Sequence, residues 1–175
     1  MPQPSPAKGA YITECGTYRY TLWRIWDSSK PMIMFIGLNP STADAELDDP
    51  TIRRCIRFAT DWEYGGFFML NLFAFRATDP GDMKKANDPV GLVNNYCLID
   101  IGSRCKDVVF VWGEHGSHRG RDKQVIAMFP NAWCMGKNKS GRPKHPLYLR
   151  SDTRLEPYRS STPPRDEQKF NGSLG

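Results

Sequence analysis

The chain has 175 residues, of which 39% are hydrophobic and 12% aromatic, so we expect a single globular domain with a sizeable core. No apolar run is long enough to cross a membrane, and the N-terminus lacks a charged-then-apolar leader, so we expect a cytoplasmic protein without a membrane partner. The net charge of +5 is compatible with a nucleic-acid partner, but a merely basic soluble protein fits it equally well.

The N-terminal part of the chain predicts an arm followed by two strands. Residues 1–16 are rich in proline and poor in apolar side chains at their start, so we expect a flexible arm. Residues 17–26 alternate apolar and polar side chains, which is typical of a half-buried, antiparallel edge strand. Residues 32–36 form a short continuous apolar run that ends at Gly37 and Pro40, which indicates a fully buried strand.

The remaining elements alternate between helices and buried strands. The helices are expected at residues 49–62, where Asp49 is the N-cap and Pro50 the first helical residue, and at 89–104 and 119–129. Further buried strands are expected at residues 67–75, 108–112 and 131–136. The segment 76–82 reads as a loop, and from residue 151 the composition predicts a low-complexity C-terminal tail.

This order predicts an α/β fold. Buried strands that alternate with helices form a mostly parallel sheet that is covered on both faces. We therefore expect a three-layer α/β/α sandwich with four central strands and the strand at 17–26 on its N-terminal edge. The domain would span residues 17–150, between the arm at 1–16 and the tail at 151–175.

Polar side chains follow each of the four central strands, on the edge of the sheet where parallel strands end. The residues are Asn39 and Ser41, then Asn71, then Glu114 and His115, and finally His145, which is reached through a basic loop. Ligands of open α/β sheets bind at this edge, so the pattern locates a site without identifying its chemistry.

Asn71 is the most informative of these residues, because it interrupts an apolar run between Leu70 and Leu72. A buried amide costs a few kcal/mol unless it is hydrogen-bonded. It either ties down a neighbouring loop or reads a ligand edge that carries both a donor and an acceptor, as a nucleobase does.

A basic loop precedes His145, which on its own would be interpreted as a surface-loop histidine. The basic residues are Lys137, Lys139, Arg142 and Lys144. They are either a solvated surface or contacts for phosphate beside a reacting group.

Several other chemistries lack their motifs. The five cysteines form no C-x-x-C pair or Cys/His finger, which argues against structural zinc and iron–sulfur clusters and favours reduced, mostly buried thiols. The sequence contains no P-loop, no G-x-G-x-x-G and no G-x-S-x-G element.

Four strings of the sequence resemble a family known only as domain-of-unknown-function family 1643, found in bacteria and phages. They are residues 37–44, 49–55, 71–78 and 145–149, and the likeness extends from about residue 18 to 149. This resemblance implies no settled activity.

A shorter set of motifs resembles the uracil-DNA glycosylase superfamily. Gly37-Leu38-Asn39-Pro40 looks like the motif that places the attacking water, and Leu70-Asn71-Leu72 looks like the strand whose Asn reads the pyrimidine. Residues 109–113 are similar to the strand before the third loop, and His145-Pro146 is similar to the start of the leucine-insertion loop. The resemblance implies a uracil-DNA glycosylase-like sandwich.

The resemblance also implies roles for individual residues. Asn39 would position a water and His145 would stabilise the leaving base, without a metal or cofactor. The base would be bound by Gly37, Leu38, Pro40 and Asn71, with Phe73 stacking on it. Phosphate or nucleic-acid contacts would come from Ser41, Lys137, Lys139, Arg142 and Lys144.

The sequence departs from the superfamily after His145-Pro146. A small residue and an exposed Leu are usual there, whereas Leu147-Tyr148-Leu149 follows here. The substrate is therefore left open between single-stranded DNA, duplex DNA and a free nucleotide. We expect a hydrolase, in DNA repair or base modification, that cleaves the N-glycosidic bond of a normal or modified pyrimidine. The alternative is a non-catalytic module that binds a nucleobase, nucleotide or nucleic acid, and a monomer is assumed in either case.

Overall fold

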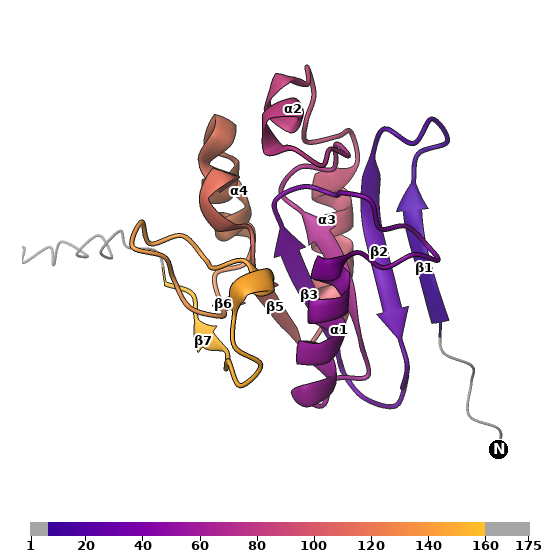
Figure 1. Cartoon of the computed structure of the whole chain (residues 1–175), viewed down its shortest axis with the longest axis vertical. Helices are drawn as coiled ribbons and strands as arrows, with labels where there is room; N and C mark the ends of the chain where they lie inside the picture. Colours follow the sequence, from indigo (N-terminus) through magenta and orange to yellow (C-terminus); the bar gives the residue numbers. More distant parts are fainter. Residues whose placement is uncertain (1–6, 160–175) are drawn as a thin grey trace, which may run out of the picture.

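The computed structural model describes residues 7–159 and shows a mixed α/β fold around one seven-stranded sheet (Figure 1). The strand order is β1-β2-β4-β3-β5-β6-β7. The strands are β1 (Ala7–Ile12), β2 (Arg19–Ile25), β3 (Met32–Gly37), β4 (Gly66–Asn71), β5 (Asp107–Phe110), β6 (Trp133–Cys134) and β7 (Glu156–Pro157). The α-helices are α1 (Pro50–Asp61), α2 (Pro80–Lys85), α3 (Asn94–Arg104) and α4 (Arg121–Met128), with 3₁₀ helices η1 (Gly113–Gly120) and η2 (Pro146–Tyr148).

The four strands expected at the centre of the sheet are present and parallel to one another. β3 pairs with β4 and β5, and β5 pairs with β6, all in parallel register. The sheet is nevertheless larger than the expected four central strands with one N-terminal edge strand. The expected edge strand is β2, which pairs with β4, and two strands that were not expected extend the sheet further: β1 pairs with β2, and β7 pairs with β6.

The strand at the start of the predicted domain is antiparallel, as expected, but it is not an edge strand. β1 pairs along it, so residues 7–12 of the predicted arm belong to the sheet. Gly9 lies opposite Trp23, and a Cβ at Gly9 would come within 2.3 Å of the indole. β1 is held by backbone pairing with β2 and by the Trp23 indole that lies against Gly9. Neither contact can be recognised from the pattern of apolar residues. The arm expected at residues 1–6 lies outside the described residues.

The domain also extends beyond the predicted boundary at residue 150. β7 pairs with β6, and the Tyr158 backbone N–H donates to the carbonyl of Ala132 at 2.9 Å. The ring of Tyr158 meets Phe110 edge-on, with centroids 5.2 Å apart. Residues 151–159 are therefore part of the fold, and the remainder of the predicted tail, 160–175, lies outside the described residues.

The helix expected at residues 49–62 forms as α1 with the predicted cap. The Asp49 carboxylate accepts from the Ile52 backbone N–H at 2.8 Å, and Pro50 begins the helix. The helix expected at residues 89–104 begins only at Asn94. Gly91 has a φ of +90°, which is incompatible with a right-handed helix, so the residues before Asn94 do not continue it. The short helix α2 forms in a segment that was expected to be a loop.

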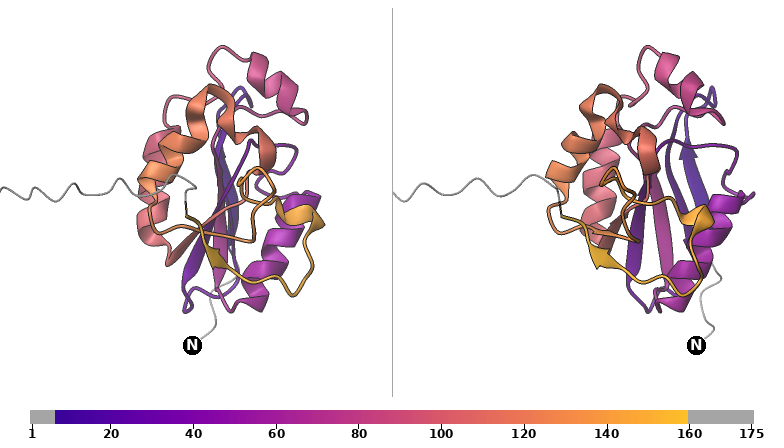
Figure 2. Two further views of the ribbon diagram at one scale, coloured as in Figure 1. Left: turned by 90° about the vertical axis from the view of Figure 1, so that its left-hand side faces the viewer. Right: turned by 60° about the vertical axis from the view of Figure 1, so that its left-hand side comes forward.

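Helices cover both faces of the sheet, as Figure 2 shows with the sheet seen nearly edge-on. α1 packs on the face that carries Ile33 and Phe35, while α3 and α4 pack on the face that carries Met34 and Ile36. Within residues 7–159, no helix has the length and apolar character needed to cross a membrane. The carboxyl ends of β3, β4 and β5 are left uncovered between these layers.

Candidate functional site

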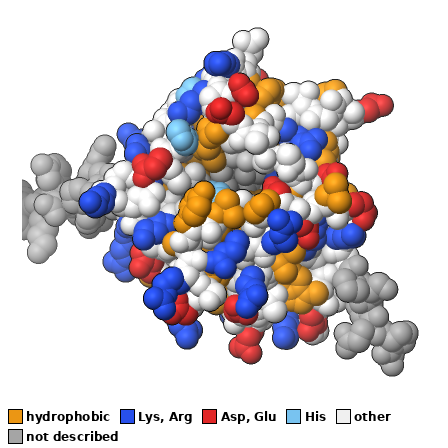
Figure 3. Space-filling model, viewed as in Figure 1, with side chains coloured by type: hydrophobic (Ala, Val, Ile, Leu, Met, Phe, Trp, Pro, Cys, Tyr) orange, Lys and Arg blue, Asp and Glu red, His pale blue; other side chains and the backbone are white. Residues whose placement is uncertain are grey.

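A cavity of about 680 Å³ lies where β3, β4 and β5 end. Its walls include the segments that follow these strands, the start of α1 and the 3₁₀ helix η2, and Figure 3 shows the surface hollowed there. The volume falls within the range of small-molecule sites. The pocket occupies the sheet edge that the strand-end pattern predicted.

Asn39 is held at the pocket by its amide nitrogen. The Nδ2 group donates to the carbonyls of Ala77 at 2.8 Å and Pro40 at 3.1 Å. These bonds fix the rotation of the amide, and no donor of the described residues bonds its Oδ1. The side chain therefore presents a free acceptor with a fixed orientation to the cavity that it lines.

Asn71, the last residue of β4, is 3% exposed and lines the same pocket. Its Nδ2 is buried and has no hydrogen-bond partner in the described chain. A different amide ties the neighbouring segments together: Asn94 Nδ2 donates to the backbone carbonyls of Asn71 and Leu72, at 3.0 and 3.1 Å. Asn94 therefore ties these segments together, and the Asn71 side-chain Nδ2 takes no part in this contact.

Gly37 provides the space that Asn71 needs. The two residues are paired in register on β3 and β4, and a Cβ at Gly37 would lie 2.8 Å from Asn71 Oδ1. We expect Gly37→Ala to displace the Asn71 amide and to weaken ligand binding by about tenfold, with a loss of about 1–3 kcal/mol in the free energy of unfolding measured in urea.

The double variant checks this prediction. In a Gly37→Ala/Asn71→Ala chain the clash is gone, so its affinity should equal that of Asn71→Ala alone. Additive losses from the two substitutions would show that Gly37 does not act through Asn71.

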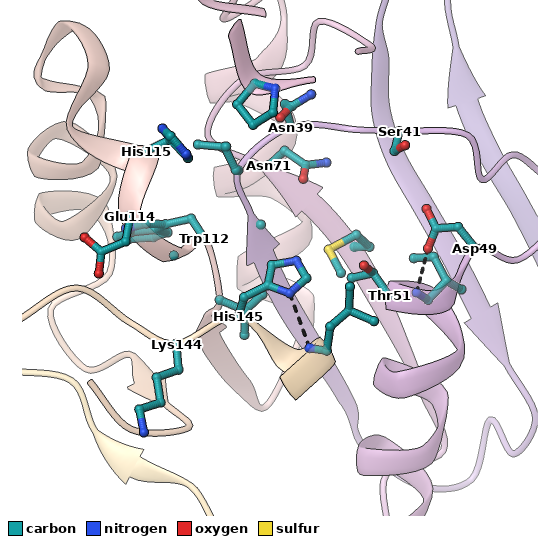
Figure 4. A pocket seen from close by; sticks show the side chains of 18 of the residues that line it. Asn39, Ser41, Asp49, Thr51, Asn71, Trp112, Glu114, His115, Lys144 and His145 are labelled. Atoms are coloured by element: carbon teal, nitrogen blue, oxygen red, sulfur yellow. Dashed lines mark hydrogen bonds between the residues drawn. The ribbon is translucent and has the colours of Figure 1, made fainter. Parts of the chain in front are cut away.

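His145 precedes η2, and its ring points toward the same space as Asn39 and Asn71 (Figure 4). Its Nδ1 accepts from the Leu147 backbone N–H at 3.3 Å. Burial lowers the pKa of His145 below its ordinary value, although the charge of Asp49 opposes this shift. The ring is therefore neutral at pH 7, and because Nδ1 is an acceptor we assign the proton to Nε2.

Arg54 of α1 holds the segment that carries His145, a contact that sequence reasoning missed. Its Nη2 donates to the Leu149 carbonyl and its Nε to the Pro146 carbonyl, at 3.5 Å for the second bond. Its guanidinium lies 4.8 Å from the centroid of Phe58. Arg54 is thus a positioning residue that fixes η2 against α1.

The predicted phosphate contacts separate into two groups. Ser41 and Lys144 line the pocket, whereas Lys137, Lys139 and Arg142 do not. Arg142 forms an ion pair with Glu114 at 3.1 Å, and Lys137 donates to the Arg159 carbonyl at 2.7 Å. Of the four basic residues in this loop, only Lys144 is therefore placed to contact a ligand in the pocket.

The predicted base-binding residues also separate. Gly37 and Leu38 line the pocket, whereas Pro40 is buried behind it and contributes the carbonyl that binds Asn39. The expectation that Phe73 stacks on a base is not met, because its ring is fully buried in the core and does not line the cavity. The aromatic residues that line it are Trp112 and Tyr148.

Two buried pocket residues were missed by sequence reasoning. Trp112 is 2% exposed with an unpartnered Nε1, and Arg19 is 3% exposed with an unpartnered Nε, within the described chain. Trp112 directly follows the apolar run of β5, which was a usable signal. Arg19 gave no signal, because a charged residue in an alternating strand is normally interpreted as facing solvent.

Metal ligation has no cluster to support it in the described part of the chain. No group of three or more His, Cys, Asp or Glu side chains is placed to hold an ion within residues 7–159. The five cysteines are free thiols, three of them buried.

Comparisons with known proteins identify a family but no characterised relative. None of the curated proteins and none of the solved structures matches the chain. One family model, described as a protein of unknown function (DUF1643), matches residues 19–147. This range runs from β2 into η2 and contains Asn39, Asn71 and His145. Because the match covers well over half of the chain, the protein belongs to the DUF1643 family.

Proposed function

We propose that this protein is a glycosylase-like hydrolase that cleaves the N-glycosidic bond of a pyrimidine, in DNA or in a nucleotide. One observation carries the proposal. Asn39, Asn71 and His145 come from three separate segments and line one cavity. No described residue bonds Asn39 Oδ1, Asn71 Nδ2 or His145 Nε2. These atoms are the acceptor and donors that the chemistry needs.

The reaction places opposite charges on the two parts of the substrate. A water oxygen forms a bond to C1′ of the sugar, the C1′–N bond breaks, and the base leaves with the electron pair. The water proton passes to solvent or to the departing base. Asn39 Oδ1 would hold the water by accepting its hydrogen bond, which orients the water without deprotonating it, since an amide is a weak base.

His145 and Asn71 would act on the base. The neutral imidazole donates its Nε2–H to an oxygen of the leaving base, where negative charge develops. Asn71 offers an amide to the polar edge of the base. The likeness of these segments to the uracil-DNA glycosylase superfamily gives the same three roles and supports the proposal.

A base-release assay by mass spectrometry tests the proposal. The protein would be incubated with single- and double-stranded DNA that carries uracil, mismatched thymine or 5-substituted pyrimidines, and with the matching free nucleotides. We expect one base to be released at a rate far above that of the blank. Saturable binding with every substrate recovered intact would instead indicate a non-catalytic module.

A further inference from the structure

The guanidinium of Arg19 is a buried charged group that lines the pocket and has no role in the proposed reaction. Arg19 begins β2, is 3% exposed and lines the cavity beside the strand that ends in Asn71. A buried charge costs several kcal/mol unless it is paired and hydrogen-bonded. Its partners therefore need to be accounted for.

The protein provides Arg19 with few partners. Its Nη1 donates to the Ala43 carbonyl at 2.9 Å, and its Nε is buried without a partner in the described chain. No described residue accepts from its Nη2, and no described carboxylate lies within 4.0 Å of it. The edge formed by Nε and Nη2, which binds oxyanions in a bidentate manner, has no hydrogen-bond acceptor among the described residues.

Arg24 on the same strand shows what a structural arginine looks like here. It is 6% exposed, and its Nε forms an ion pair with Asp48 at 2.9 Å. Its Nη1 and Nη2 donate to four backbone carbonyls, those of Gly9, Trp23, Asp44 and Leu47. The two arginines are buried on one strand but differ in their hydrogen bonds. All three nitrogens of the Arg24 guanidinium donate to protein acceptors, whereas only Nη1 of Arg19 does so within the described chain.

The charges around Arg19 do not neutralise it by contact. Asp49 and Asp44 are its acidic neighbours, and Arg76 and Arg24 its basic ones. Each carboxylate is engaged by its own backbone: Asp49 caps α1, and Asp44 accepts from the N–H groups of residues 46 and 47. Burial lowers the pKa of Arg19 to about 10, so the group is still a cation at pH 7.

We infer that Arg19 binds the terminal phosphate of a nucleotide whose base is held at Asn71. This inference rests on the proposed function, and it selects a mononucleotide or a phosphorylated chain end over an internal nucleotide of DNA. Arg19 begins β2, Asn71 ends the neighbouring strand β4, and both side chains line the same cavity of about 680 Å³, so one nucleotide bound there could reach both. A phosphodiester inside a strand carries chain on both sides, whereas a terminal phosphate has one free end with which to reach a side chain that is only 3% exposed.

The test is calorimetric binding of 2′-deoxyuridine, thymidine and 2′-deoxycytidine 5′-monophosphates, each compared with its own nucleoside. We expect the wild-type protein to prefer one nucleotide over its nucleoside by about tenfold to a hundredfold, the range for hydrogen bonds to charged groups. Arg19→Gln should abolish this preference and leave the nucleoside affinity unchanged. An Arg19→Gln chain that keeps the preference would overturn the inference.

A matched control separates binding from folding. Arg121 is 1% exposed and has an unpartnered Nη2 in the described chain, but it does not line the pocket. Arg121→Gln should therefore destabilise the protein without changing the preference for the nucleotide. Arg19→Lys keeps the charge but lacks the fork, and we expect it to retain part of the preference.

Two further measurements test phosphate binding at Arg19 without requiring catalysis or a particular base. A 5′-phosphorylated oligonucleotide compared with the same strand without phosphate distinguishes a chain end from a free nucleotide. Inorganic phosphate should raise the unfolding temperature of the wild-type protein more than that of Arg19→Gln at equal ionic strength. If phosphate stabilises both chains equally and no nucleotide is preferred, Arg19 is not an anion site, whether or not a base is released.

Discussion

Asn39→Ala is expected to lower base release by about a thousandfold while the protein remains folded. The side chain offers one free atom, Oδ1, because Nδ2 is bound to the carbonyls of Ala77 and Pro40. Alanine removes the acceptor that holds the attacking water. The substrate can still bind, since Asn71 and His145 are unchanged, so the loss should appear in kcat and not in KM.

The structural cost of this substitution is about 2 kcal/mol for the two lost hydrogen bonds and can be measured separately. The two carbonyls that accept from Asn39 would lose their donor, which costs about 1 kcal/mol for each hydrogen bond. Urea unfolding followed by circular dichroism measures this loss. Asn138→Ala is the matched control, because Asn138 also lines the pocket and is an amide with no assigned role in catalysis. Release by Asn39→Ala at the rate of Asn138→Ala would reject the assigned role.

The sheet was predicted where burial decides the structure and missed where backbone pairing decides it. The runs that became β3, β4 and β5 are continuous and apolar because helices cover both of their faces. β1 and β7 carry no such pattern, since all but one of their residues are exposed or partly exposed and they add to existing strands through their backbones. Their existence depends on the edges of β2 and β6, which are distant in sequence.

The candidate site was predicted from position and misjudged where side-chain direction mattered. Asn39, Asn71 and His145 converge because parallel strands end at one edge, which follows from the order of elements alone. The resemblance implied that Phe73 stacks on the base, but its ring is fully buried in the core, a direction that the sequence does not reveal. Arg19 is buried by the loop that contains Ala43, and only the folded chain brings these residues together.

His145→Ala is expected to lower base release by about a hundredfold, the usual loss for one donor to a developing negative charge. The donor is Nε2, because Nδ1 accepts from the Leu147 N–H. His145→Gln retains an amide donor and should therefore keep more activity than alanine. Arg54, which binds η2 through two carbonyls, is unchanged in both variants and holds the segment in place.

The pH dependence distinguishes a neutral from a charged imidazole. Burial lowers the pKa of His145, so wild-type release should be constant from pH 8 down to about 6.5 and fall only below that value. The fall arises because a proton on Nδ1 removes the acceptor for the Leu147 N–H and displaces the ring. His145→Gln does not titrate, so its acid decline should disappear.

The lowered pKa of His145 also makes the free energy of unfolding depend on pH. Because the pKa of His145 is lower in the folded chain, the unfolded chain takes up the proton first as pH falls through 6.5. The free energy of unfolding of the wild-type protein should therefore decrease below pH 6.5 relative to His145→Gln, and the decrease should end below the folded-state pKa. Urea titrations of both chains between pH 5 and 8 measure this difference. A wild-type protein that becomes more active, or relatively more stable, as pH falls would show that the imidazolium is the working form.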